Sequence, residues 1–160
     1  MRTLAVFFMM FLSTQVMAQN VPELNSLVDK AIFPHPVFIV PNPPKPIKGW
    51  NIQELLMGDE MQNVLKGSPD GQIIKFRFRG TAVGMLAYTN KNSASIECSV
   101  DGQPWMEIEL AAETEELQLK GFTLDNDLKN RKHTLQIRIP KASKQLTGHV
   151  LLRSFYVNQN

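Results

Sequence analysis

The feature that most constrains the fold is the alternation of apolar and charged residues between Ile73 and Leu110, which Gly80 and the pair Asp101-Gly102 interrupt. This period of two is the signature of half-buried antiparallel strands joined by tight turns. The sequence therefore predicts an all-β sandwich. The side chains expected to face its core are Ile74, Phe76, Phe78, Ile96, Cys98, Val100, Met106, Ile108, Leu110, Leu135, Ile137 and Ile139.

The remainder of the second half fits the same architecture. Leu117 and Leu119 suggest a further strand, and residues 150–157 are apolar enough for a central strand, with no alternation that assigns their side chains to a face. Turn signals recur every 8–15 residues or so, and no stretch there has helical periodicity. A sandwich or jelly roll has this organisation.

The N-terminus has the pattern of a secretory signal peptide over residues 1–18. Arg2 supplies a positive charge, Leu4 to Leu12 form an apolar run, and Ala18 is the small residue before the cut. Cleavage there predicts a secreted or periplasmic protein that begins at Gln19. The alternative is a buried N-terminal strand or helix. The apolar run is shorter than the about 20 residues of a membrane span, so no membrane span is expected.

Residues 19–50 are predicted to form a short helix, over residues 20–32, and then a proline-rich extended arm. Asn20 can cap the helix and Pro22 suits its first turn. Six prolines between Pro34 and Pro46 exclude a helix or a central strand. The apolar residues between them favour an arm that packs along the sandwich as an edge strand, and a free linker is the alternative. The sandwich domain is expected over residues 51–160, although residues 50–65 also fit a helical turn.

The overall charge does not indicate a nucleic-acid partner. The 17 basic and 15 acidic residues give a net charge of +2, so no nucleic acid is expected to bind. Lys75, Arg77 and Arg79 are expected to face acids across the strands, the candidates being Glu97, Glu107 and Glu109. Cys98 is the one cysteine, so it cannot form a disulfide within the chain, and its phase places it in the core.

The sequence contains no recognisable catalytic centre. No serine lies in a Gly-x-Ser-x-Gly or Gly-Asp-Ser motif, and the histidines, His35, His133 and His149, have no metal-ligand spacing. His133 is expected to be a structural residue on the core side of a strand. Glu107 and Glu109 share one strand face rather than opposing each other across a cleft. A polar turn is preferred over a calcium site at Asp125-Asn126-Asp127. Hence no enzyme activity, cofactor or metal is expected.

Two aromatic residues, Trp105 and Tyr88, are the candidates for ligand binding. Trp105 falls out of phase with the inward row, and an exposed aromatic ring among polar groups can stack on the apolar face of a sugar. Of the aromatic residues, these two are the ones expected to be exposed, and their exposure in a shared groove would support a binding site. The alternative for Trp105 is packing beneath a loop or the proline arm.

Four segments, taken in order, resemble a known domain. They are residues 76–84 (FRFRGTAVG), 99–102 (SVDG), 133–135 (HTL) and 155–158 (FYVN). Together they are similar to the jelly-roll domain that accompanies secreted SGNH/GDSL-type esterases of bacteria, a galactose-binding-like β-sandwich, over roughly residues 60–158 of this chain. The catalytic SGNH part of those esterases is absent from this sequence.

The resemblance implies a secreted noncatalytic module that binds carbohydrate or another protein. Its partner would be a polysaccharide or a carbohydrate-active enzyme. One alternative is an accessory or truncated part of an esterase that acts with a separate catalytic subunit. Another is a purely structural domain of the cell envelope with no small ligand.

Overall fold

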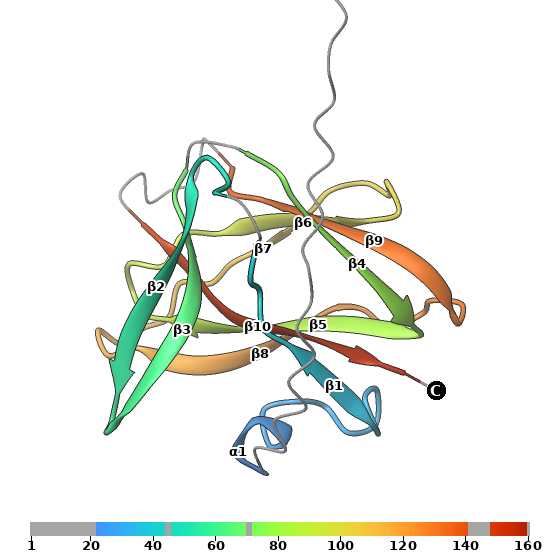
Figure 1. Cartoon of the computed structure of the whole chain (residues 1–160), viewed down its shortest axis with the longest axis horizontal. Helices are drawn as coiled ribbons and strands as arrows, with labels where there is room; N and C mark the ends of the chain where they lie inside the picture. The colour runs from blue at the N-terminus through green and yellow to red at the C-terminus, as the bar shows by residue number, and fades with distance from the viewer. Residues whose placement is uncertain (1–21, 44–45, 70–71, 141–147, 160) are drawn as a thin grey trace, which may run out of the picture.

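The computed structural model describes residues 22–43, 46–69, 72–140 and 148–159 (Figure 1). The predicted signal peptide, residues 1–18, and the predicted cap Asn20 lie outside these ranges. The described elements, in chain order, are α1 (Pro22–Asn25), β1 (Pro36–Ile39), β2 (Trp50–Met57), β3 (Glu60–Gly67), β4 (Ile74–Gly80), β5 (Ala82–Thr89), β6 (Ile96–Val100), β7 (Met106–Ile108), β8 (Gln118–Asp125), β9 (Arg131–Arg138) and β10 (Val150–Asn158).

The strands form two antiparallel sheets, which confirms the predicted all-β sandwich. The six-stranded sheet has the order β2-β3-β10-β5-β8, and β1 also pairs with β10. The four-stranded sheet has the order β4-β9-β6-β7. The neighbour of the basic strand β4 is therefore β9, and Lys75, Arg77 and Arg79 lie opposite Gln136, Thr134 and Lys132. The expected pairing of this row with Glu97, Glu107 or Glu109 is wrong.

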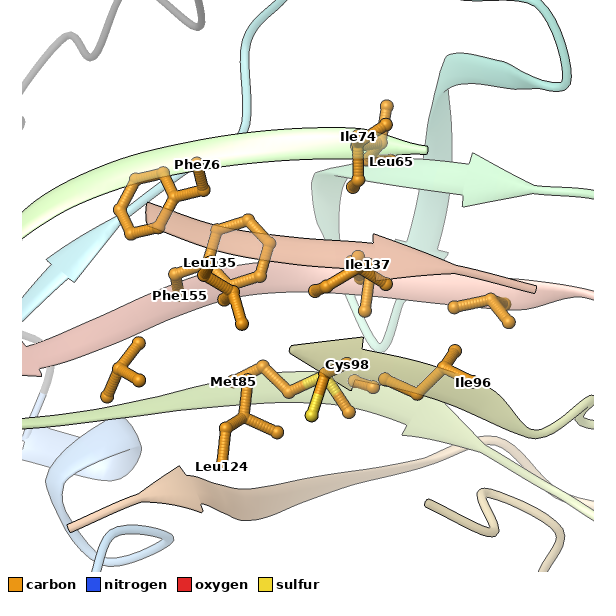
Figure 2. Close-up of a cluster of buried hydrophobic side chains, with 14 of the residues drawn as sticks. Leu65, Ile74, Phe76, Met85, Ile96, Cys98, Leu124, Leu135, Ile137 and Phe155 are labelled. Carbon is orange, nitrogen blue, oxygen red and sulfur yellow. The ribbon is translucent and has the colours of Figure 1, made fainter. Parts of the chain in front are cut away.

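The main core lies between the two sheets, and the predicted inward rows fill it (Figure 2). Phe76 is 2% exposed, and its ring stacks on Phe155 with the centroids 4.7 Å apart. Met106 is the exception among the inward residues, because its side chain is 45% exposed. It lies on β7, a three-residue strand at the edge of its sheet, where nothing in the described chain covers it.

A second apolar cluster joins the N-terminal segment to the outer face of the six-stranded sheet. Leu24, Val28 and Phe33 pack there with Leu86 and Tyr156. The Phe33 and Tyr156 rings meet edge to face at 4.7 Å between centroids. Figure 1 shows α1 on the side of this sheet that faces away from β4 and β9. As a result β5 and most of β10 are buried on both faces, which removes the alternation from their sequences.

The predicted helix over residues 20–32 is wrong in length, because α1 contains four residues. The chain turns at Asp29 instead. The Asp29 carboxylate accepts a hydrogen bond from the Ala31 amide at 2.9 Å, and the Asp29 carbonyl accepts one from the Phe33 amide at 2.8 Å. An aspartate that binds nearby amides in this way competes with helix formation.

The proline arm contributes β1, an edge strand, as its apolar residues indicate. β1 pairs with Phe155–Asn158 of β10, while β3 pairs with Val150–Leu152 on the same strand. Proline is tolerated in an edge strand because no neighbouring strand needs its missing amide hydrogen. Residues 50–67 form the β2–β3 hairpin rather than a helical turn.

Candidate functional site

The outer face of the four-stranded sheet is the open face of the sandwich. The N-terminal segment covers the outer face of the six-stranded sheet over β5 and β10, whereas the outward side chains of β4 are all exposed. We call the surface of β4, β9, β6 and β7 that faces away from the core the outer β4–β7 face. Its side chains are almost all polar, and its one aromatic residue is Trp105. They are Lys75, Arg77, Arg79, Lys132, Thr134, Gln136, Arg138, Glu97, Ser99, Trp105 and Glu107.

Trp105 lies immediately before β7 and is half-buried. The guanidinium carbon of Arg138 lies 4.1 Å from the centroid of its ring, within the range of a cation–π contact. Arg138 is the cross-strand neighbour of Glu97, and its Nε donates a hydrogen bond to the Glu97 carboxylate. These contacts hold the indole on the outer β4–β7 face. The prediction that Trp105 faces outward is confirmed, and its role as a ligand contact stays a prediction.

Polar side chains in and beside β6 and β7, the strands next to Trp105, have fixed partners. The Ser95 hydroxyl donates a hydrogen bond to the Glu107 carboxylate at 2.8 Å, and the Ser99 hydroxyl donates one to the Gln103 carbonyl at 2.6 Å. An aromatic ring bordered by oriented hydrogen-bonding groups is the kind of surface on which a sugar can stack and bind through its hydroxyls.

Tyr88 does not share this surface, and the expectation that its ring is exposed is wrong. Tyr88 is 4% exposed, and it lies on β5 in the other sheet. Tyr88 is an even number of residues from Ala82 and Leu86, which belong to the second cluster, so all three side chains point to the outer side of the six-stranded sheet. The tertiary structure covers both faces of β5, which no local pattern around Tyr88 indicated.

His133 lies on the core side of its strand, as predicted, and its partner Asp101 was missed from the sequence. The His133 ring is buried. Its Nδ1 lies 2.8 Å from Asp101 Oδ2, and its Nε2 lies 2.7 Å from the Lys129 carbonyl oxygen. Both partners are acceptors, so each ring nitrogen faces a group that can take a hydrogen bond from it. No ring nitrogen is left to act as a general base toward a substrate.

Asp101 fixes the β6–β7 turn to β9. Its Oδ1 accepts the Thr134 amide at 2.8 Å, and Arg131 lies 3.4 Å from Oδ2. Desolvation raises the pKa of Asp101, but hydrogen bonds from His133 and Thr134 and the charges of His133 and Arg131 outweigh it, so the pKa lies below its ordinary value. The residues that join here belong to two of the segments that carry the family resemblance, 99–102 and 133–135.

The other candidate reactive groups have structural surroundings. Burial, followed by the charge of Asp125, raises the pKa of the Cys98 thiol to about 11, which suppresses its thiolate. The Asp125 carboxylate accepts the Asp127 amide at 3.1 Å, which makes the predicted polar turn. Burial and the charge of Lys66 lower the pKa of His149. Within the described ranges, no three or more His, Cys, Asp or Glu side chains are grouped so that they could hold a metal ion.

Comparison with known proteins gives the family. Residues 62–160 match the family model of the carbohydrate esterase 2 N-terminal domain. This chain belongs to that family. The match begins within β3 and extends beyond β10, so it includes the whole outer β4–β7 face. The N-terminal segment and β2 precede the matched residues. None of the curated proteins is significantly similar to the chain in sequence.

Solved esterases share the fold of this family member. A two-domain esterase active on acetylated mannans, co-crystallised with mannopentaose, aligns with a TM-score of 0.62 at 14% identity. The alignment covers 83% of this chain but 39% of that chain. A second structure of a two-domain esterase active on acetylated mannans aligns with a TM-score of 0.57 at 13% identity, covering 83% of this chain and 38% of that chain. This chain therefore spans about two fifths of the length of these esterases.

No helix in the described part of the chain is both long and apolar enough to cross a membrane.

Proposed function

We propose that this carbohydrate esterase 2 N-terminal domain is an exported, noncatalytic module that binds polysaccharide on the outer β4–β7 face. The observation that carries the proposal is the position of Trp105. Its indole is half-buried on the open face of the sandwich and is held by Arg138, which is itself paired with Glu97. A ring fixed before the ligand arrives loses little conformational freedom on binding.

The test is binding to a panel of polysaccharides by affinity gel and calorimetry. Acetylated mannan belongs in the panel because the aligned two-domain esterases act on it. We expect Trp105→Ala to weaken binding about tenfold or more, equivalent to about 1.4 kcal/mol. Met106→Ala is the matched control, because Met106 is the next residue, is 45% exposed and lies on the opposite side of β7. Equal binding by wild type and Trp105→Ala would remove the indole from the site.

The noncatalytic part of the proposal rests on the state of the reactive groups. Ester hydrolysis by a protein nucleophile needs an activated side chain and a base within hydrogen-bond reach. The Cys98 thiol is buried with a pKa of about 11, and both nitrogens of His133 have partners. We expect no hydrolysis of aryl acetate or acetylated xylan above background. Turnover that copurifies with the protein through several columns would refute this expectation.

A second candidate function is docking to a separate catalytic chain, which the β2–β3 hairpin favours. Leu56 and Met61 lie opposite each other near its end and are 66% and 59% exposed, and Ile52 is 42% exposed. We expect Leu56→Asp with Met61→Asp to abolish co-elution with an SGNH-type esterase and to leave polysaccharide binding unchanged. Co-elution that survives both substitutions would exclude the hairpin as the contact.

A further inference from the structure

The outer β4–β7 face has an uneven charge distribution. Its β4 side has the basic side chains of Lys75, Arg77 and Arg79, and Lys132 of β9 adds a fourth. All four are exposed. We call these four residues the basic row. The acidic residues of the face, Glu97 and Glu107, lie on β6 and β7 at the opposite side.

The acidic residues of the same face have other partners. Glu97 is paired with Arg138, and Glu107 accepts the Ser95 hydroxyl. Across the parts of the chain that the structure describes, Lys75, Arg79 and Lys132 form no ion pair with an acid. The basic row is therefore a concentration of positive charge on a protein whose net charge is only +2.

Protection of a sheet edge does not account for Lys132. Charged side chains on an edge strand prevent unwanted pairing with other chains, and β4 alone would provide them. Lys132 lies on the inner strand β9, directly opposite Arg79. Like charges directly opposite each other destabilise a sheet, so this pair costs stability. A bound anion would convert that repulsion into attraction.

We propose that the basic row binds the carboxylate groups of an anionic, uronate-bearing polysaccharide. This inference rests on the proposed function, since it names the class of polymer that the outer β4–β7 face selects. Successive outward side chains of β4 are about 6.8 Å apart along the strand. Thr134 and Gln136 lie beside them on β9 and can bind sugar hydroxyls.

The basic row and Trp105 are close enough to contact one polymer chain. β4 and β7 are three strand spacings apart, or about 14 Å. A chain that crosses the face would meet cations at β4, then hydroxyl and amide groups, then the indole. The acids Glu97 and Glu107 at the far side repel a polyanion in proportion to its charge density. Duplex nucleic acid carries one negative charge per about 1.7 Å of its axis, a higher density than one carboxylate per sugar, so these acids favour a uronate polymer over nucleic acid.

The experiment compares polygalacturonate with its methyl ester, which has the same backbone without the charges, using the full chain and calorimetry at low and high salt. The test variant is Arg79→Gln with Lys132→Gln. The matched control is Lys30→Gln with Lys120→Gln, which removes two exposed cations outside this face. Melting curves verify folding, and we expect the test variant to melt at or above the wild-type temperature, because a repulsion is removed.

We expect polygalacturonate to bind more tightly than its methyl ester, with the preference reduced by salt and reduced about three- to tenfold in the test variant but not in the control. Equal binding of the two polymers, or a preference unchanged in the test variant, would overturn the inference and leave the proposed function standing. Failure to bind any polysaccharide would overturn both. Tighter binding of a short DNA duplex than of polygalacturonate would show a general polyanion surface and also overturn it.

Discussion

Replacing Asp101 with asparagine tests the contact that joins the β6–β7 turn to β9. Asparagine has nearly the same shape and also tolerates the left-handed backbone of this position, where φ is 51°. The substitution therefore removes the charge and one acceptor oxygen while leaving the turn conformation accessible. Gly102, with φ of 77°, completes the turn, and the Gln103 amide donates to the Val100 carbonyl across it.

The expected loss follows from the partners of the carboxylate. Asp101 accepts hydrogen bonds from His133 and from the Thr134 amide, and the His133 side chain is 2% exposed. Asparagine can accept through one oxygen and presents an amide donor to the other partner. A hydrogen bond to a charged group contributes about 1.5–3 kcal/mol, and a buried donor without a partner costs a similar amount. We expect Asp101→Asn to lower the free energy of unfolding by about 2 kcal/mol.

Thermal unfolding followed by circular dichroism measures this loss, which corresponds to a decrease of about 6–8 °C in Tm at neutral pH. Asp59→Asn is the control, because Asp59 lies exposed in the β2–β3 turn, and its change should stay within about 0.5 kcal/mol. Because the pKa of Asp101 is lowered by folding, its contribution is complete above the unfolded value of about 3.9 and is lost as the pH falls through the folded pKa. The difference between wild type and Asp101→Asn should therefore shrink below about pH 4. A Tm difference that is absent at pH 7, or undiminished in acid, would refute the reasoning.

Three further predictions concern the core, the cysteine and export. Phe76→Ala should cost about 3–5 kcal/mol in chemical denaturation, since the ring is buried against Phe155, whereas Leu56→Ala at a 66% exposed position should cost far less. Equal denaturation midpoints for these two variants would contradict the packing. Cys98 should react with a thiol reagent at pH 8 only after unfolding, because its pKa is about 11, and rapid labelling of the native protein would show an accessible thiolate. Mass spectrometry of exported protein should find an N-terminus at Gln19, and an intact Leu4–Leu12 segment would exclude cleavage.

The two strands most fully understood from sequence were β4 and β9. Their alternation identified Phe76 and Ile137 as inward and Arg77 as outward, because the direction of a side chain in a strand depends only on its position in a period of two. The Asp101-Gly102 turn was equally readable, since positive φ values at both positions favour these residue types. The resemblance carried by residues 76–84 and the later segments led to the right family.

Sequence alone left open what covers each face and which strands become neighbours. Tyr88 is buried on β5, which lies between β10 and β8 in the six-stranded sheet, and Met106 is exposed because its strand ends the other sheet. The basic residues of β4 face Lys132 rather than an acid, because β9 and not β6 or β7 pairs with β4. Asp101 meets His133 across 32 residues of sequence. Periodicity is a local property and fixes which side chains share a face, whereas strand pairing and coverage depend on contacts between distant segments, which only the tertiary structure decides.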